Sequence, residues 1–129
     1  LSTALGIAHN HKSAVCLTGD LALLHDSNGF LSRHHFQGHL TIVLVNNNGG
    51  GIFEMLPIAE FPDVFEDYFA TPQNIDFSKL CATYDIEHKL ISNWQELSIL
   101  LDPLPKTGIR VLELHTNRKQ SQQWRNINN

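Results

Sequence analysis

The residues with the clearest chemical potential are an aspartate and an asparagine that each follow an apolar run. Asp20 comes after the run 14–18 and Gly19, and Asn47 follows the run 40–45. Runs of this kind are typical of buried strands. If they are parallel strands joined by a helix, both side chains lie at the sheet edge where open α/β proteins bind ligands. Carboxylate and amide oxygens are hard ligands, so the pattern predicts Mg²⁺ holding a diphosphate.

The backbone near these side chains adds further candidate ligands. Gly49 can supply a carbonyl oxygen to a metal beside Asp20 and Asn47. The N–H groups of Leu21 and Ala22 would open the crossover helix and direct its positive dipole end at phosphate. The glycine run after Asn47 would let the chain pass close to a ligand without a Cβ clash.

Each half of this pattern also has an ordinary explanation. Asp and Asn at strand ends commonly serve turns, and glycine runs commonly supply positive φ angles. The pair of motifs, spaced by one crossover, favours a binding site over loop material. A non-catalytic α/β binding module, in which Asp20 and Asn47 are turn residues only, stays open as an alternative.

Composition favours one globular domain. The chain has 129 residues, a net charge of −4 and 42% apolar residues, with no cluster of basic residues, which disfavours nucleic-acid binding. No apolar run approaches the ~20 residues of a membrane helix, so we expect no stable membrane insertion. Cys16 and Cys81 are far apart and are interpreted as buried thiols in a reducing cytoplasm. Because helical spacing begins at Leu1, we expect 1–129 to be part of a longer multidomain protein.

Strand and helix patterns alternate along the chain. Strands are predicted over 14–18, 40–45, 89–91 and 110–115. Helices are predicted over 2–11, 21–36, 77–84 (capped by Asp76) and 94–101 (capped by Asn93), with a tail over 116–129 that is helical or frayed. We expect the runs 14–18 and 40–45 to be buried under helices on both faces. Together these elements predict an open, mainly parallel α/β sheet with helices on both faces.

The segment 53–75 combines aromatic side chains with prolines. A loop of this length inside a compact domain is usually functional, which favours a wall of the binding site. A satellite hydrophobic cluster pinned by prolines is the alternative. Within this segment we expect a short helix over 64–70, capped by Asp63.

Three motifs together resemble a known enzyme family. The pair Gly19-Asp20, a crossover and the pair Asn46-Asn47 resemble the diphosphate-binding motif of thiamine diphosphate enzymes, although the usual glycine after Asp is Leu21 here. With leucine at this position, the sequence resembles one branch of the family, the synthases of menaquinone and phylloquinone biosynthesis. The other motifs that support this branch are Asn46-Asn47-Asn48-Gly49-Gly50-Gly51-Ile52-Phe53 and Thr71-Pro72-Gln73-Asn74.

The resemblance implies a cofactor-binding domain of a transferase or lyase. It implies thiamine diphosphate with Mg²⁺ (or Mn²⁺), decarboxylation of 2-oxoglutarate, and addition of the resulting succinyl carbanion to isochorismate. The cofactor would lie against a partner subunit, in a dimer or tetramer of the full-length enzyme. The glutamate that activates the cofactor lies outside this chain, so we expect no catalytic residue here and an inactive isolated chain. A 2-oxo acid decarboxylase or acetolactate synthase type remains the alternative within the family.

The resemblance also assigns residues to the site. The metal ligands would be Asp20, Asn47 and Gly49, and the apolar substrate walls would be Ile52 and Phe53, with Leu56 nearby. The full set assigned to the cofactor is Gly19, Asp20, Leu21, Ala22, Asn47, Gly49, Gly50 and Ile52.

Overall fold

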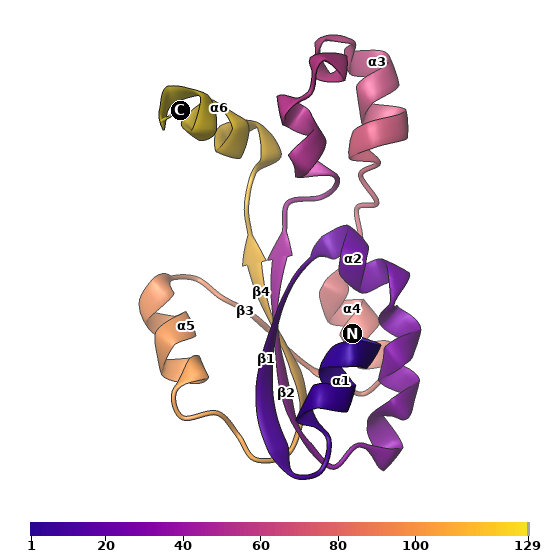
Figure 1. Cartoon of the computed structure of the whole chain (residues 1–129), viewed down its shortest axis with the longest axis vertical. Helices are drawn as coiled ribbons and strands as arrows, with labels where there is room; N and C mark the ends of the chain where they lie inside the picture. The colour runs from indigo at the N-terminus through magenta and orange to yellow at the C-terminus, as the bar shows by residue number, and fades with distance from the viewer. Residues whose placement is uncertain (129) are drawn as a thin grey trace.

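The computed structural model describes residues 1–128 and builds them around one open parallel sheet with helices on both faces (Figure 1). The four strands lie in the order β1-β2-β4-β3. Their bounds are β1 (Lys12–Gly19), β2 (Gly38–Asn46), β3 (Glu87–Leu90) and β4 (Gly108–His115). Every pair of neighbouring strands is parallel, which confirms the predicted fold class.

One face of the sheet carries the larger core. The elements that cover it are α1 (Ser2–Ala8), α2 (Asp20–His25), the 3₁₀ helix η1 (Ser27–His35) and α4 (Phe77–Thr83) (Figure 1). Leu40, Ile42 and Leu44 of β2 point into this core, where they meet Phe30 and Phe77. The alternation of side chains along a strand therefore assigns the even positions of β2 to this face.

The other face carries a smaller core under α5 (Trp94–Leu101). Val43 of β2 and Leu112 of β4 pack there against Leu97. Because β2 is covered on both sides, its apolar run shows no alternation, as predicted for a central parallel strand.

The prediction that helices cover both faces of the run 14–18 is wrong. β1 is an edge strand, and its side chains alternate between half-buried and exposed. Ala14 and Cys16 pack on the larger core, but Val15 and Leu17 are 47% and 73% exposed on the α5 side. The helix α5 packs over β2 and β4 and leaves this part of β1 uncovered. An apolar run alone does not reveal that one face lacks a cover.

The first predicted helix is shorter than expected. α1 ends at Ala8 and not at residue 11, because Asn10 and His11 adopt positive φ angles of 60° and 63° and turn the chain into β1.

The crossover predicted as one helix over 21–36 is divided in two. α2 ends at His25 and η1 begins at Ser27, so the break falls at Asp26. The residues after Asp26 include Asn28 and Gly29, which are poor helix formers. A Cβ on Gly29 would meet the side chains of Leu1 and Ser2 at 3.0 Å, so the close neighbour of this glycine is the start of α1.

The aromatic segment forms short helices beyond the carboxyl ends of the strands (Figure 1). They are η2 (Gly51–Met55), η3 (Pro57–Glu60), α3 (Pro62–Phe65) and η4 (Glu66–Ala70), and the tail forms α6 (Arg118–Asn128) beside them. Asp63 does not cap a helix over 64–70, because α3 already begins at Pro62 after Phe61. The caps predicted at Asp76 and Asn93 are confirmed: their side chains accept hydrogen bonds from the N–H groups of Lys79 and Glu96.

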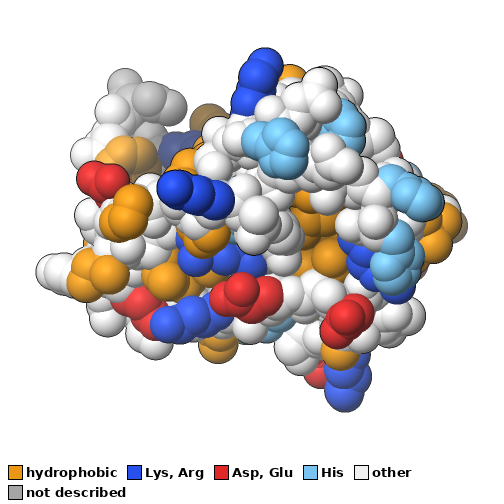
Figure 2. Space-filling view, turned by 90° about the horizontal axis from the view of Figure 1, so that it is seen from below, with side chains coloured by type: hydrophobic (Ala, Val, Ile, Leu, Met, Phe, Trp, Pro, Cys, Tyr) orange, Lys and Arg blue, Asp and Glu red, His pale blue; other side chains and the backbone are white. Residues whose placement is uncertain are grey.

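The opposite end of the molecule carries charged, histidine and hydrophobic side chains together (Figure 2). Figure 2 shows that acidic and basic side chains are interspersed there and that histidines gather on one side. This is the amino-terminal end of the sheet, away from the loops that follow β1 and β2 (Figure 1). None of the helices formed by residues 1–128 combines the length and the apolar character needed to cross a bilayer.

Candidate functional site

Two of the predicted metal ligands meet at the carboxyl end of the sheet. Asp20 is the first residue of α2, directly after β1, and only 6% of it is exposed. Its Oδ2 atom accepts a hydrogen bond of 2.7 Å from the backbone N–H of Gly49, in the loop after β2. The ends of neighbouring parallel strands thus bring the two motifs together, as the sequence predicted.

The third predicted ligand has an unusual environment. The Oδ1 atom of Asn47 is buried and accepts no hydrogen bond from any described residue. A buried oxygen without a donor costs free energy, so such an atom calls for a specific explanation. A cation beside it would supply the missing partner. The set formed by the Asp20 carboxylate, the Asn47 amide oxygen and the Gly49 carbonyl suits a hard cation such as Mg²⁺.

Within residues 1–128, no three His, Cys, Asp or Glu side chains gather as a metal cage. The candidate site uses one carboxylate together with an amide and a backbone carbonyl. Mg²⁺ is commonly bound in this way, by a small number of protein oxygens together with the phosphates of a ligand. The residues therefore fit a metal that arrives with a diphosphate.

The glycines after Asn48 have a role that the sequence did not reveal. A Cβ on Gly49, whose φ is 135°, would lie 2.3 Å from the carbonyl oxygen of Ala70. A Cβ on Gly50 would lie 2.5 Å from the carbonyl oxygen of Phe69. We expected the glycines to leave room for a ligand, but at both positions the chain's own η4 backbone occupies the nearest space.

The loop that carries Asn47 is held on both sides. The backbone N–H of Asn48 donates to Oδ1 of Asn46 at 3.0 Å. Asn48 and Asn74 also bond reciprocally. The side-chain amide of Asn48 donates to Oδ1 of Asn74 at 2.8 Å, and the backbone N–H of Asn74 donates to Oδ1 of Asn48 at 3.0 Å. The motif that contains Asn74 thus fixes the turn in which Asn47 lies.

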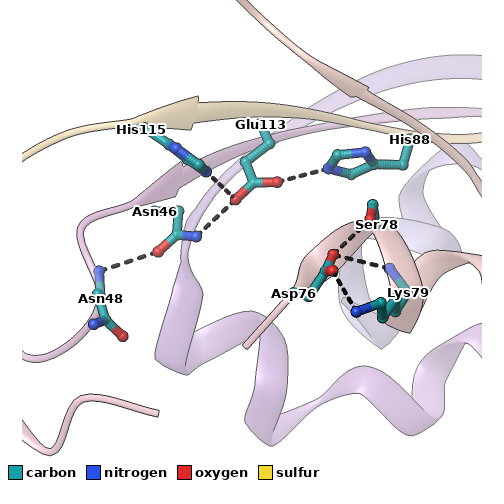
Figure 3. A network of polar contacts seen from close by, with 8 residues as sticks. All are labelled: Asn46, Asn48, Asp76, Ser78, Lys79, His88, Glu113 and His115. Atoms are coloured by element: carbon teal, nitrogen blue, oxygen red, sulfur yellow. Dashed lines mark hydrogen bonds and ion pairs between the residues drawn. The ribbon is translucent and has the colours of Figure 1, made fainter. Parts of the chain in front are cut away.

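A buried carboxylate supports the same loop from β4. Glu113 accepts hydrogen bonds from Asn46 at 2.6 Å, from His88 at 2.6 Å and from His115 at 2.8 Å (Figure 3). Burial by itself would raise the pKa of Glu113, but these three bonds outweigh it and hold the pKa below its ordinary value. No motif in the sequence marks this cluster. The available signal was a charged residue between two leucines of a predicted strand.

The predicted apolar walls lie on η2 and just after it. Ile52, Phe53 and Leu56 are 74%, 37% and 47% exposed. Large apolar side chains exposed together indicate a surface that another part of a protein covers. This exposure suits a site wall, but Phe53 also packs edge-on against Phe69, which stacks on the buried Phe65, so the segment holds a small aromatic cluster as well.

An ion-pair cluster fixes this segment to the tail helix. Arg118 at the start of α6 pairs with Glu54 at 2.9 Å and with Glu66 at 2.8 Å. Both Arg118 and Glu54 are largely buried. The adjacent Arg118 and Lys119 suggest a solvated face from the sequence, which is wrong for Arg118. Its partners Glu54 and Glu66 are far from it in the chain, and no motif links them.

The first turn of α2 begins at Asp20. Gly19 is the residue before the helix, and no side chain among the described residues caps it. Leu21 and Ala22 form the first turn together with Asp20. The residues assigned to the cofactor therefore come from the β1–α2 junction and from the segment after β2, which the Asp20–Gly49 bond joins.

Comparison with known proteins matches this arrangement to a family. The family model for the thiamine pyrophosphate enzyme, C-terminal TPP binding domain, matches residues 1–109. The chain belongs to this family. Thiamine pyrophosphate is another name for thiamine diphosphate, so the resemblance inferred from the three motifs is confirmed.

Two relatives of this thiamine pyrophosphate-binding domain share a name. The chain is 68% identical over 128 residues to a 2-succinyl-5-enolpyruvyl-6-hydroxy-3-cyclohexene-1-carboxylate synthase of Gloeothece citriformis, covering 99% of this chain and 22% of that protein. It is 69% identical over 124 residues to the protein of the same name from Crocosphaera subtropica, covering 96% of this chain and 21% of that protein. The chain thus spans about a fifth of the length of these relatives.

A solved structure supports the fold of this thiamine pyrophosphate-binding domain. The crystal structure of benzoylformate decarboxylase from Polynucleobacter necessarius superimposes with a TM-score of 0.66 over 84% of this chain and 20% of that chain. At 17% identity, this likeness concerns the fold alone.

Proposed function

We propose that the chain is the diphosphate- and metal-binding domain of a thiamine diphosphate-dependent synthase. The synthase decarboxylates 2-oxoglutarate and transfers the succinyl unit to isochorismate, a step of menaquinone and phylloquinone biosynthesis. The relatives with 68% and 69% identity that carry the synthase name support this choice of reaction. The single structural observation behind the binding role is the buried, unpartnered Oδ1 of Asn47, two residues before Gly49, whose backbone N–H donates to Asp20.

The residues of this chain hold the cofactor at its diphosphate end. Asp20, Asn47 and Gly49 supply oxygen ligands to Mg²⁺ (or Mn²⁺), which neutralises diphosphate charge. The backbone N–H groups of Leu21 and Ala22 donate to diphosphate oxygens. Gly19 and Gly50 place main chain near the same group, and all these contacts fix the cofactor's position before substrate arrives.

When bound, thiamine diphosphate supplies an electron sink for the electron pair that is left when CO₂ departs from a 2-oxo acid. The part played by this chain is to bind, orient and exclude water. Ile52, Phe53 and Leu56 would supply an apolar wall to the site of the bound cofactor. Such a wall limits premature protonation by solvent.

The exposed apolar side chains of 51–70 support a subunit interface at this wall. Phe61 and Tyr68 are exposed there in addition to Ile52. We infer that a second subunit covers them in a homo-oligomeric enzyme, a dimer or tetramer, and brings the residue that activates the cofactor. The chain 1–129 alone is therefore one inactive domain of a longer protein. Cys16 and Cys81 are free thiols, which suits an enzyme of the cytoplasm.

The test uses the intact enzyme that contains this chain. Thiamine diphosphate is titrated with and without Mg²⁺, and CO₂ release from 2-oxoglutarate is measured with and without isochorismate. We expect metal-dependent cofactor binding and an adduct that forms only when both substrates are present. The isolated 129-residue chain should release no CO₂ above a cofactor-free blank.

The other outcomes separate the alternatives. CO₂ release from pyruvate, with no adduct formed from isochorismate, would favour a 2-oxo acid decarboxylase or acetolactate synthase type. Loss of metal-dependent cofactor binding altogether would favour a non-catalytic α/β module and would contradict the proposal.

A further inference from the structure

The carboxylate of Glu113 lies where an apolar row of the sheet ends. On the larger core face, β2 presents Ile42 and Leu44 and then Asn46, while the adjacent β4 presents Val111 and then Glu113. The register pairs Leu44 with Glu113, so Asn46 lies one side-chain step beyond Glu113 on the same face. The polar cluster therefore begins at the carboxyl end of the sheet, next to the Asn47 loop.

Glu113 has three donors and little contact with solvent. Only 4% of the residue is exposed. Asn46 and His115 donate to Oε1, and His88 donates to Oε2 (Figure 3). An ionised carboxylate accepts and does not donate, so each of these partners must present an N–H group to it.

This requirement fixes the amide of Asn46. Its Nδ2 must face Glu113, at 2.6 Å, and its Oδ1 must face the other way. That oxygen accepts the backbone N–H of Asn48 at 3.0 Å and so closes the turn around Asn47 (Figure 3). The backbone carbonyl of Asn46 is also fixed, because it accepts the N–H of Thr116 at 2.9 Å.

We propose that Glu113 is a positioning residue for metal binding: through Asn46 it shapes the turn that aims the Asn47 amide oxygen at the cation. This inference rests on the proposed function, because it assumes that Asn47 is a metal ligand. Glu113 touches neither metal nor cofactor, and it acts as an outer partner of a ligand loop. Outer partners of this kind typically contribute 10- to 100-fold to metal affinity.

A purely structural role is the competing explanation. Glu113 also joins β3 to β4 through His88, so its loss would loosen the sheet edge whatever happens at the metal site. Metal affinity and thermal stability therefore have to be measured side by side. His115 provides a matched control, because it donates to the same Oε1 atom as Asn46 but does not belong to the Asn47 turn.

The experiment measures Mg²⁺ affinity at saturating thiamine diphosphate and the melting temperature, in the intact enzyme. Glu113→Ala should weaken Mg²⁺ binding by about 10- to 100-fold. Glu113→Gln should restore most of that affinity, because its amide oxygen still accepts from Asn46 and its NH₂ group can meet the other tautomer of His88. His115→Ala should leave Mg²⁺ affinity unchanged.

A double-mutant cycle tests whether Glu113 acts through Asn46. Asn46→Ala should weaken Mg²⁺ binding as much as Glu113→Ala, and the double variant should be no worse than either single one. The proposal would be overturned if the loss of Mg²⁺ affinity in the double variant equalled the product of the two single losses. It would also be overturned by a Glu113→Ala variant that has wild-type affinity and only a lower melting temperature. If Glu113→Ala does not fold, Asn46→Ala with wild-type affinity contradicts the proposal equally. A wild-type enzyme that binds no Mg²⁺–cofactor complex would instead refute the proposed function.

Discussion

Oδ2 of Asp20 lies 2.7 Å from the backbone nitrogen of Gly49, although 29 positions separate the two residues in the chain. This contact joins the first residue of α2, directly after β1, to the loop after β2 at the carboxyl end of the sheet. The carboxylate that we propose as a metal ligand therefore also holds the loop that carries Asn47 and Gly49. Loss of Asp20 should remove a ligand and disturb this loop at once.

Replacing Asp20 with alanine should abolish Mg²⁺-dependent cofactor retention in the intact enzyme. The loss should exceed the roughly 10- to 100-fold typical of outer partners, because a direct ligand and the Gly49 contact disappear together. Asp26→Ala is the control, since that carboxylate faces Ser2 of α1 and not the site. Equilibrium dialysis of the two variants checks this, and equal retention would show that the wrong carboxylate had been chosen.

Gly49→Ala should destabilise the ligand loop. The new Cβ would clash with the Ala70 carbonyl at 2.3 Å, and the φ of 135° disfavours any L side chain. We expect a loss of about 1–3 kcal/mol of folding stability together with weaker cofactor binding. Gly6→Ala in α1 should instead stabilise by up to about 1 kcal/mol, because nothing lies within 4 Å of its added Cβ. Thermal unfolding of both variants tests the difference.

Arg118→Ala should release the aromatic segment 51–70 from α6. Removal of one partner of a buried ion pair costs roughly 3–5 kcal/mol, and we expect the lower end because Glu66 is 35% exposed. The remaining charge of Glu54 would be buried without a counter-ion. Hydrogen exchange of peptides covering 51–70 should become faster, whereas β2 should keep its protection. Lys119→Ala, an exposed neighbour on α6, should change neither region.

A buried histidine at the amino end of β2 should make stability depend on pH. His39 donates from one ring nitrogen to the Thr107 carbonyl, and its other ring nitrogen lies 2.7 Å from the Thr41 hydroxyl, to which Arg110 also donates. Burial lowers the pKa of His39 below its ordinary value of 6.5, Arg110 lowers it further, and Glu87 opposes the shift.

The direction of the pH effect follows from proton binding. Below pH 6.5 the unfolded chain binds a proton at His39 while the folded chain does not, so folding stability falls with acidity. Above that pH the contribution of the neutral His39 to folding stability is fully present. Between about pH 7.5 and 5.5, a His39→Gln variant should lose less stability than the wild type. The exposed His25→Gln variant should follow the wild-type slope, and denaturant unfolding at both pH values measures all three.

Much of the candidate site could be predicted because its signals are local. A strand that is buried on both faces has no alternation, and β2 shows this directly. The caps at Asp76 and Asn93 depend on side chains that accept from the backbone N–H three positions along, so a short stretch of sequence is enough to predict them. The ligand candidates Asp20 and Asn47 each follow an apolar run that is visible in the sequence.

Only the tertiary structure decided which strand faces are covered and which side chains of separate strands meet. Whether Val15 and Leu17 of β1 are covered depends on where α5 packs, which is set by contacts distant in the sequence. The bond between His88 and Glu113 exists because β3 pairs with β4 in one register. Side-chain periodicity shows which residues share a face of their own strand, but only the pairing of separate strands decides which faces and which charges meet.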